Sequence, residues 1–385
     1  MNTNRDYLLV VRYPTGGIRT HIKYAAQLSP PCPDAPHPVL VCPDDAEGKA
    51  LRQALGLNLD RFESQHATSA VDLLFATFRA ARKWRPAVIH SHGFTSAICA
   101  SPSTLLRGVR HVITVHDVVT PGLVARTPKF GLLLLGLVLR FSYAVHAVGE
   151  DCATSLRALP FMRHARNLIT IRNGINVQQF TSVTPADLRT KLSLEQDCVL
   201  VGFFGRFMAQ KGFRTLVDAM RFVIDAAGTK RIVVIAVGSG AFIREDKDYI
   251  KSKGLSDSFF FLDAVENPAS LIAGVDMVAM PSRWEAYPLL AAEVLCLGVP
   301  LIASNCIGLR EAVRDTPAIS LDPDNPERLA QAISEEAINS SKVVFANFVE
   351  TAIQRFDFRP NAALIQRLLI DAQRGASLAH DELLR

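Results

Sequence analysis

The sequence predicts an α/β protein with two doubly wound parallel sheets. Short apolar runs alternate with helical patterns along the chain. The runs are apolar throughout, which is typical of parallel strands covered by helices on both faces. The alternation occurs twice, and a polar stretch without a strand pattern separates the two series at 176–196. A chain of 385 residues has room for two or three domains.

Both series are regular enough to assign element by element. In the first half the expected strands are 7–11, 38–41, 88–90, 112–115, 144–148 and 168–171, with a helix at 69–84. In the second half they are 199–204, 232–237, 259–262, 277–280, 301–303 and 318–321, with helices at 213–227, 289–297 and 326–338. We expect domains at 1–180 and 181–355, and a helical tail at 356–385 that packs back on the first domain.

Composition excludes several classes of protein. Apolar residues make up 49% of the chain and charged residues 21%, which excludes a disordered or fibrous chain. Residues 1–190 hold 21 Lys and Arg against 12 Asp and Glu, a net charge of +9, whereas the remaining residues carry −4. An anionic partner is therefore expected on the first half, although the total of +5 does not indicate nucleic acid.

Cysteine usage and hydropathy favour a cytoplasmic protein. The seven cysteines are scattered and form no C-x-x-C pair, which argues for a reducing compartment and against a zinc site. The apolar stretch at the N-terminus is too short for a signal peptide. The most apolar segment, 130–139, is too short to span a bilayer, and we expect a buried helix there in preference to a membrane-touching face.

Ligands of doubly wound sheets bind beyond the C-terminal ends of the strands, so the residues after each strand are the candidate site. Gly16 and Gly17 follow the first strand and precede a helical pattern, which suits an anion, although a tight turn explains them equally well. Arg206 and Lys211 follow the strand at 199–204 and suit a diphosphate. Two solvated surface cations are the alternative for this pair.

Two glutamates follow the strand at 277–280. Glu285 lies on the loop before a helix, where it can meet a polar ligand. Glu293 lies inside an apolar helical pattern, where an unpaired carboxylate is costly, so a cation or the hydroxyls of a ribose are its expected partners. A helix cap and a salt-bridged carboxylate are the structural alternatives.

These motifs together resemble the retaining glycosyltransferases of family 4. The resemblance rests on Gly-Arg-x4-Lys-Gly at 205–212, Glu-x7-Glu at 285–293, Gly-x-Pro at 298–300, Gly-x2-Glu at 308–311, Thr-Val-His-Asp at 114–117, Asn-Gly-Ile-Asn at 173–176 and Gly-Ser-Gly at 238–240. It implies the GT-B fold, in which two Rossmann-like domains face each other across a cleft. Several positions depart from the family pattern: Asn176, Asp263, Ala286, Pro288 and Leu309.

The resemblance implies a role for each matching residue. Catalytic roles would fall to His116, Arg206, Lys211 and Glu285, with the two cations on the donor diphosphate, Glu285 on the hydroxyls of the transferred sugar and His116 beside the reacting bond. Substrate-binding roles would fall to Gly16, Gly17, Asn173, Gly238, Tyr287, Pro288, Leu289 and Glu293, with Glu293 on the ribose. Proline at 288 has no N–H, so one backbone contact to phosphate is missing there.

The reaction implied is transfer of a hexose from a nucleotide-diphosphate sugar to an acceptor hydroxyl, in polysaccharide or glycolipid assembly. Retention of configuration is expected, with the departing phosphate oxygen taking the acceptor proton. No cofactor and no metal are expected, because fixed cations meet the charge of the leaving group. The acceptor would be a glycan or a lipid-linked molecule, and the basic first half suggests peripheral contact with an anionic membrane.

Weaker patterns leave alternatives open. His90 and His92 have a metal-ligand spacing, although no neighbouring Cys or carboxylate completes a set. The D-x-D triplets at 246–248 and 322–324 are interpreted as structural. The basic cluster at 79–85 is either a solvated helix end or a membrane-facing patch. A nucleotide-sugar epimerase and a non-catalytic nucleotide-sugar-binding subunit are the alternative functions, and a dinucleotide oxidoreductase lacks its G-x-G-x-x-G motif.

Overall fold

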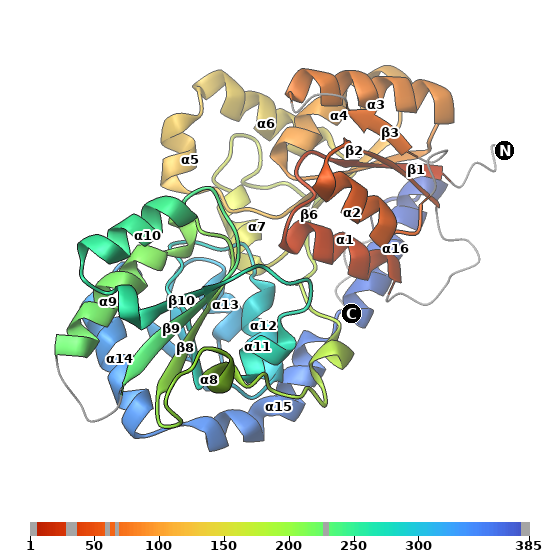
Figure 1. Ribbon diagram of the computed structural model, residues 1–385. Coiled ribbons are helices and arrows are strands. Elements are labelled where there is room, and N and C mark those ends of the chain that lie inside the picture. Colours follow the sequence, from red (N-terminus) through yellow and green to blue (C-terminus); the bar gives the residue numbers. More distant parts are fainter. Residues whose placement is uncertain (1–5, 28–36, 58–61, 66–68, 226–230, 379–385) are drawn as a thin grey trace. The chain divides into compact units, whose positions relative to one another are not determined.

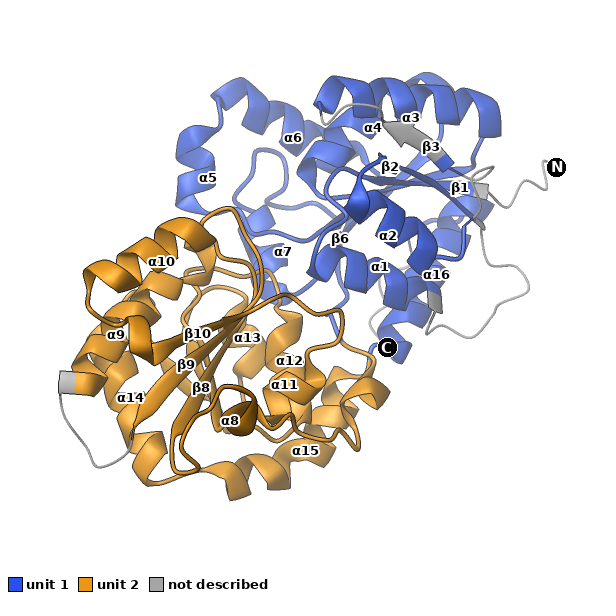
Figure 2. Cartoon of the chain, viewed as in Figure 1, with its two compact units in different colours: residues 1–174, 358–385 blue, residues 175–357 orange. Residues whose placement is uncertain are grey.

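A computed structural model of the chain describes residues 6–27, 37–57, 62–65, 69–225 and 231–378 (Figure 1). The chain divides into two compact units (Figure 2). Unit 1 comprises residues 1–174 and 358–385, and unit 2 comprises residues 175–357. The chain therefore passes between the units at 174–175 and 357–358, where the sequence placed boundaries at 180–181 and 355–356.

Unit 1 is built on a seven-stranded parallel sheet in the order β3-β2-β1-β4-β5-β6-β7. Its strands are β1 (Asp6–Val11), β2 (His37–Pro43), β3 (Phe62–Gln65), β4 (Val88–His92), β5 (Arg110–Val115), β6 (Ala144–Ala147) and β7 (Leu168–Thr170). Residues of β1 alternate between the two faces of the sheet, as the pleat requires. Leu8 and Val10 join the core under one layer of helices, and Leu9 and Val11 join the core under the other.

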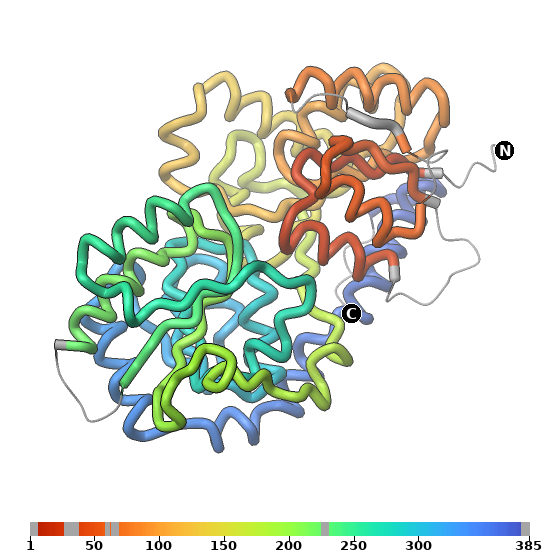
Figure 3. The backbone as a smooth tube through the Cα atoms, viewed as in Figure 1, coloured from red at the N-terminus to blue at the C-terminus, as the bar shows by residue number. Residues whose placement is uncertain are grey.

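Helices cover both faces of this sheet. The longer ones are α1 (Gly17–Gln27), α2 (Ala46–Ala54), α3 (Ala70–Trp84), α4 (Phe94–Arg107), α6 (Lys129–Phe141) and α16 (Arg359–Arg374), with shorter α5 (Pro121–Arg126) and α7 (Glu150–Leu156). On one face α4 packs between α3 and α6, and on the other α1 packs against α2 and α16. The backbone trace in Figure 3 shows how α16, near the C-terminus, returns to the elements of the first half.

Unit 2 is built on a six-stranded parallel sheet in the order β10-β9-β8-β11-β12-β13. Its strands are β8 (Val199–Phe204), β9 (Ile232–Val237), β10 (Phe259–Leu262), β11 (Met277–Met280), β12 (Leu301–Ser304) and β13 (Ile319–Leu321). Its helices are α8 (Leu188–Lys191), α9 (Phe213–Asp225), α10 (Ile243–Ser252), α11 (Ala269–Ala273), α12 (Leu289–Cys296), α13 (Leu309–Val313), α14 (Pro326–Ile338) and α15 (Lys342–Phe356). Helix α9 packs with α14, and α12 packs with α15.

Each sheet has one point where the strand order reverses. In unit 1 this point lies between β1 and β4, and in unit 2 it lies between β8 and β11. Loops that leave two such neighbouring strands diverge to opposite faces of the sheet and leave a crevice at its C-terminal edge, where ligands of this fold class bind. The loops concerned begin at Arg12 and Gly93 in unit 1, and at Gly205 and Pro281 in unit 2.

The predicted fold class is confirmed, and all twelve expected strands are present. Strand β3 and several helices, among them α2, α4 and α15, were not predicted. The four residues of β3, Phe-Glu-Ser-Gln, lack an apolar run because this strand lies at the edge of the sheet. The six described cysteines are free thiols.

The expectation of a buried helix at 130–139 is wrong in part. Helix α6 buries Leu135, Gly136 and Leu139, but Phe130 exposes 74% of its surface. The reason is that α6 lies in the outer helix layer and packs through one side only, against α4. Within the described residues, no helix has both the length and the apolar character needed to cross a bilayer.

Candidate active site

The loop after β8 carries the two predicted diphosphate ligands in unit 2. It runs from Gly205 through a short 3-10 turn, Ala209–Lys211, to the start of α9. Gly212, between the turn and α9, has φ +65°, and a Cβ there would lie 1.9 Å from the carbonyl oxygen of Pro281. Only glycine allows this approach, so the loops after β8 and β11 are held backbone to backbone.

The loop after β11 brings Glu285 onto Lys211. Lys211 Nζ donates to Glu285 Oε1 at 2.7 Å, and Ser282 Oγ donates to the same oxygen at 2.8 Å. The Glu285 side chain is only 7% exposed, whereas that of Lys211 is 24% exposed. The structure thus brings together two residues that the sequence assigned to different parts of the donor.

Backbone contacts hold this pair in place. The Arg283 N–H donates to the carbonyl of Gln210, and the Gln210 side chain donates to the carbonyl of Trp284 at 2.9 Å. The Glu285 N–H donates to the carbonyl of Ile307 at 2.9 Å. The first two contacts join the loop after β8 to the loop after β11, and the third joins the loop after β11 to the loop after β12, so backbone contacts with neighbouring loops hold both ions of the pair.

Arg206 and Glu293 also follow strands β8 and β11 of unit 2, but their side chains make fewer contacts than those of Lys211 and Glu285. Arg206 is exposed, and no residue in the described part of the chain pairs with its guanidinium. Glu293 is partly exposed in the second turn of α12, and desolvation raises its pKa to about 7. No described cation pairs with it either, so the salt-bridged alternative for Glu293 is not supported.

Helix α12 begins at Leu289, four residues after Glu285. Pro288 precedes its first residue, Leu289, and provides no side-chain cap. The first N–H groups of a helix have no carbonyl partner within it and favour an anion. Tyr287, just before the helix, is buried. The predicted backbone contacts to phosphate therefore lie at an uncapped helix start.

The two remaining glycine motifs behave differently. A Cβ at Gly238 would lie 1.8 Å from the carbonyl oxygen of Gly205, so this glycine lets the turn after β9 pack on the loop that carries Arg206. A Cβ at Gly16 in unit 1 would meet nothing within 4 Å, although φ there is +54°. Gly17 is the first residue of α1. Open space at the start of α1 leaves room for a ligand to approach the backbone.

A buried group of histidines lies at the C-terminal edge of the sheet in unit 1. His90 Nε2 and Thr114 Oγ1 are 2.8 Å apart, Thr114 Oγ1 and His146 Nδ1 are 3.1 Å apart, and His146 Nε2 lies 2.8 Å from the carbonyl of Ile171. A carbonyl only accepts, so His146 Nε2 carries a proton and its Nδ1 accepts from Thr114. His90 Nε2–H then donates to Thr114, and the chain is satisfied with both rings neutral.

Three further rings complete the group around His116. His116 Nε2 and His92 Nδ1 are 2.9 Å apart, and the His21 ring lies 4.8 Å from that of His116. His21 Nδ1 is 2.8 Å from Asn173 Oδ1, which accepts its proton and leaves His21 Nε2 as an acceptor. His21 Nε2 and His92 Nε2 are buried without a hydrogen-bond partner in the described structure. His116 alone of these rings is partly exposed.

Burial keeps the whole group uncharged. Desolvation is the largest cause in every case, and it lowers the pKa of His21 to about 3, that of His146 to about 4, and those of His90, His92 and His116 well below their usual value. A neutral ring both donates and accepts, which suits the hydroxyl groups of a sugar.

Three of these five rings form the one set of side chains, among the described residues, whose geometry admits a metal ion. Ligand atoms of His21, His92 and His116 lie within 4.8 Å of one another. However, the hydrogen bond between His92 and His116 already uses one nitrogen of each ring, and no carboxylate joins the set. The observed contacts are those of a hydrogen-bonded group of side chains.

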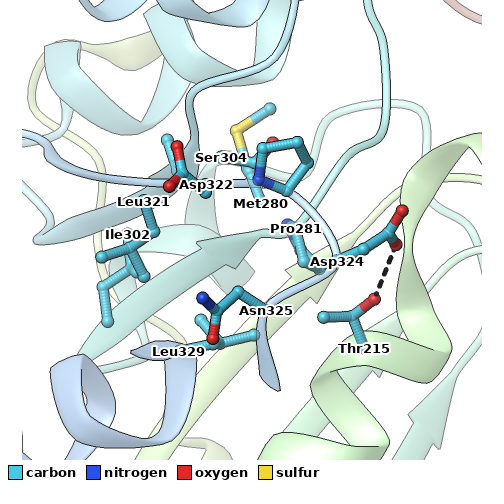
Figure 4. A pocket seen from close by; sticks show the side chains of 12 residues that line it. Thr215, Met280, Pro281, Ile302, Ser304, Leu321, Asp322, Asp324, Asn325 and Leu329 are labelled. Atoms are coloured by element: carbon cyan, nitrogen blue, oxygen red, sulfur yellow. Dashed lines mark hydrogen bonds between the residues drawn. The ribbon is translucent and has the colours of Figure 1, made fainter. Parts of the chain in front are cut away.

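Both D-x-D triplets have structural roles. Asp246 is buried and accepts from Arg214 Nε at 2.9 Å. Asp324 accepts from Arg283 Nε at 2.8 Å and from Thr215 Oγ1 at 3.3 Å. Asp324 lines a small pocket at the ends of β11, β12 and β13 (Figure 4), whose other walls are mostly apolar. This pocket adjoins the loop of Glu285 through Pro281 but contains none of the predicted site residues.

Sequence reasoning missed His21 and the connection between Lys211 and Glu285. His21 stands four residues after Gly17, on the side of α1 that also carries the buried Ile22. A polar residue at a buried helical position just after a glycine loop was the available signal. No sequence pattern indicated the ion pair, because its partners are 74 residues apart.

Two family models match the chain over most of its length. The model described as "Glycosyl transferases group 1" matches residues 198–337, and the model described as "Glycosyl transferase 4-like domain" matches residues 19–174. The first covers the loops of Lys211 and Glu285, and the second covers the histidine group. The chain belongs to the group 1 glycosyltransferases.

The chain matches about half of the length of its curated relatives. A D-inositol 3-phosphate glycosyltransferase of Saccharomonospora viridis is 28% identical over 223 residues, which cover 54% of this chain and 52% of that protein. The lipopolysaccharide core biosynthesis mannosyltransferase LpsB of Rhizobium meliloti is 27% identical over 175 residues, covering 44% and 49%.

Solved structures show the GT-B fold. Anabaena HepE in complex with UDP and glucose superposes with a TM-score of 0.78 at 20% identity, over 96% of this chain and 100% of that one. The sucrose-phosphate synthase of Thermosynechococcus elongatus superposes with a TM-score of 0.76 at 18% identity, over 96% and 99%. At this level of identity the likeness concerns the fold of the glycosyltransferase.

The neutral histidines predict acid sensitivity. A ring whose pKa is lowered in the folded protein is protonated first in the unfolded chain, so stability is full above about pH 6.5 and falls as the pH drops toward the folded pKa. Between pH 7 and 5.5 each such ring should cost about 1 kcal/mol of unfolding free energy. His111, which is not one of the five rings of the histidine group, provides the test. It is buried and hydrogen-bonded to Ser91, and desolvation lowers its pKa to about 3. In urea unfolding, His111→Gln should lose less stability on acidification than the wild type.

The exposed His164 is the matched control, because it has the same chemistry without burial. His164→Gln should keep the pH dependence of the wild type. An unchanged pH dependence in His111→Gln would contradict the assignment of buried neutral histidines as the acid-sensitive groups.

Proposed function

We propose that the chain is a retaining hexosyltransferase that moves a sugar from a nucleotide-diphosphate sugar to an acceptor hydroxyl, in polysaccharide or glycolipid assembly. The observation that carries the proposal is the contact between Lys211 and Glu285 at the strand-order reversal of unit 2. A cation for phosphate and a carboxylate for sugar hydroxyls meet there, beside the uncapped start of α12.

The donor would be held by unit 2. Lys211 and Arg206 bind the diphosphate, because both are cations on the loop after β8. Arg206 pairs with no described residue, so it can bind a phosphate without breaking an ion pair. Glu285 already directs Oε1 at Lys211, so its other oxygen remains for hydroxyls of the transferred sugar. Glu293 binds the ribose hydroxyls. Desolvation raises its pKa, and no described cation offsets that effect, so hydroxyl groups would be favourable partners.

Charge separation determines the chemistry of the step. The bond from the anomeric carbon to the diphosphate oxygen breaks, positive charge develops on the sugar, and negative charge develops on the leaving group. Lys211, Arg206 and the start of α12 stabilise that negative charge. The acceptor oxygen bonds to the same face of the carbon, and its proton passes to the departing phosphate oxygen, so configuration is retained without a metal ion.

The histidine group of unit 1 would bind hydroxyl groups of a substrate. His116 is its partly exposed member, and the hydrogen bond between His92 and His116 fixes the orientation of its ring. His21 is oriented by Asn173, and its Nε2 is an acceptor without a partner among the described residues. His21 is thus a hydroxyl-binding residue in this proposal, with Asn173 as the group that positions it.

The ligands and activities of similar proteins support the substrate class. Anabaena HepE is described in complex with UDP-glucose, and LpsB of Rhizobium meliloti is named as a mannosyltransferase of lipopolysaccharide core biosynthesis. Nucleotide sugars are accordingly the donors to screen, and glycan or lipid-linked molecules the acceptors.

A product assay tests the proposed function. In buffer with EDTA, the chain should consume a nucleotide sugar only when an acceptor is present, and NMR of the glycoside should show the anomeric configuration of the donor. Donor isomerisation without an acceptor would indicate an epimerase, and donor binding with no turnover would indicate a binding subunit. Inversion, or a requirement for a divalent metal, would contradict the mechanism above.

Variants of two charged residues should separate leaving-group stabilisation from donor binding. Lys211→Ala should lower kcat by roughly 10²-fold, because its charge matters most as the diphosphate leaves. Glu293→Ala should mainly raise KM, since a ribose contact changes little during bond breaking. The exposed Lys191, on α8 of the same unit, provides the control Lys191→Ala, which should resemble the wild type.

Steady-state kinetics at saturating donor measure both effects. A normal kcat in folded Lys211→Ala would refute the assignment of this loop to the leaving group. A Glu293→Ala variant with a lower melting temperature and unchanged KM would identify Glu293 as a structural residue.

A further inference from the structure

One helix layer of unit 1 exposes large apolar side chains. Helices α3, α4 and α6 pack side by side on the same face of the sheet (Figure 1). Each presents apolar groups to solvent, namely Phe75 and Phe78 on α3, Leu105 and Leu106 on α4, and Phe130 and Phe141 on α6. Leu105, Phe130 and Phe141 are 77%, 74% and 76% exposed. We call this surface the α3–α4–α6 face.

The exposed groups follow helical spacing, so they form rows. Val71, Phe75 and Phe78 are at positions i, i+4 and i+7 of α3, and Phe130 and Leu134 are at i and i+4 of α6. Both helices bury a different side against the protein. A helix of a soluble domain normally directs polar residues outward, so apolar rows on neighbouring helices indicate an interaction surface.

Positive charge is concentrated on the same segment. Residues 69–141 contain nine Lys and Arg against two Asp and Glu, a net charge of +7 out of the +9 of the first half. Basic side chains stand next to the apolar ones in the chain: Arg79 after Phe78, Arg107 after Leu106, Lys129 before Phe130, and Arg140 before Phe141. All four are exposed.

We propose that the α3–α4–α6 face binds an anionic lipid bilayer, with its aromatic and leucine side chains in the headgroup region and its basic side chains on lipid phosphates. Apolar groups and basic residues on one helical surface are the combination that binds membrane interfaces. The alternative, a second copy of the chain on this face, brings two surfaces of like charge together, which is unfavourable.

The inference deepens the proposed function, because a bilayer is where a lipid-linked acceptor resides. It also gives the basic cluster at 79–85 a role. Arg79, Arg82 and Lys83 are exposed in the last turns of α3, on the helix that carries Phe75 and Phe78. They are part of the face, and they bind lipid headgroups.

Vesicle flotation tests the proposal. The full chain should float with phosphatidylcholine vesicles that contain phosphatidylglycerol, and poorly with phosphatidylcholine alone. Salt of about 0.5 M, which shortens the Debye length to a few Å, should weaken binding without abolishing it, because the apolar contacts persist. Phe130→Glu/Leu134→Glu should reduce the bound fraction at least about ten-fold at either salt concentration.

The matched control changes apolar residues of similar exposure on unit 2, in the half of the chain that carries negative charge. Val343 and Val344 on α15 are 71% and 57% exposed, and Val343→Glu/Val344→Glu should float like the wild type. Circular dichroism confirms that each variant is folded. Leu105→Glu/Leu106→Glu on α4 should repeat the loss seen for α6.

Three results would overturn the proposal. They are absence of flotation at low salt, equal flotation of the α6 variant and the wild type, and a wild-type dimer in analytical ultracentrifugation that Phe130→Glu/Leu134→Glu dissociates. Affinity for UDP, measured without vesicles, tests the donor site separately. Normal UDP affinity without flotation removes the membrane face and leaves the proposed function intact.

Discussion

The contact between Lys211 and Glu285 is the interaction on which the account of this glycosyltransferase depends. An ion pair with little solvent exposure is stable only if further hydrogen bonds satisfy its members, and Ser282 supplies one to Glu285. The pair also requires the loops after β8 and β11 to touch, which the missing side chain of Gly212 allows. In the proposed function a diphosphate would compete with Glu285 for Lys211, so donor binding would exchange one counter-ion for another instead of desolvating a free cation.

The two units place different chemistry at equivalent positions of similar sheets. The strand-order reversal of unit 2 carries charged residues on glycine-packed loops, and that of unit 1 is adjacent to neutral histidines. In the proposed function, fixed charge would bind a diphosphate, and rings that both donate and accept hydrogen bonds would bind hydroxyl groups. The lowered pKa values of the buried rings in unit 1 predict that acid weakens folding there.

Sequence patterns predicted the fold class and most strands because buried parallel strands are continuous apolar runs. They failed where that signal is absent, as in the polar edge strand β3, and where it misleads, as in α6, whose apolar residues lie partly outside the core. For the site, loop motifs located Lys211 and Glu285 but not their contact, because 74 residues of chain separate them. His21 was missed because a single histidine in a helix carries no pattern, and only the fold brings it to His116.

A crystal structure of the chain with a bound nucleoside diphosphate would test the central claim most directly. The account predicts that a phosphate oxygen lies within hydrogen-bond distance of Lys211 Nζ, at the start of α12, and that Glu285 Oε1 no longer receives both of its present donors. A diphosphate bound elsewhere on unit 2, such as in the pocket beside Asp324, with the contact between Lys211 and Glu285 unchanged, would contradict it.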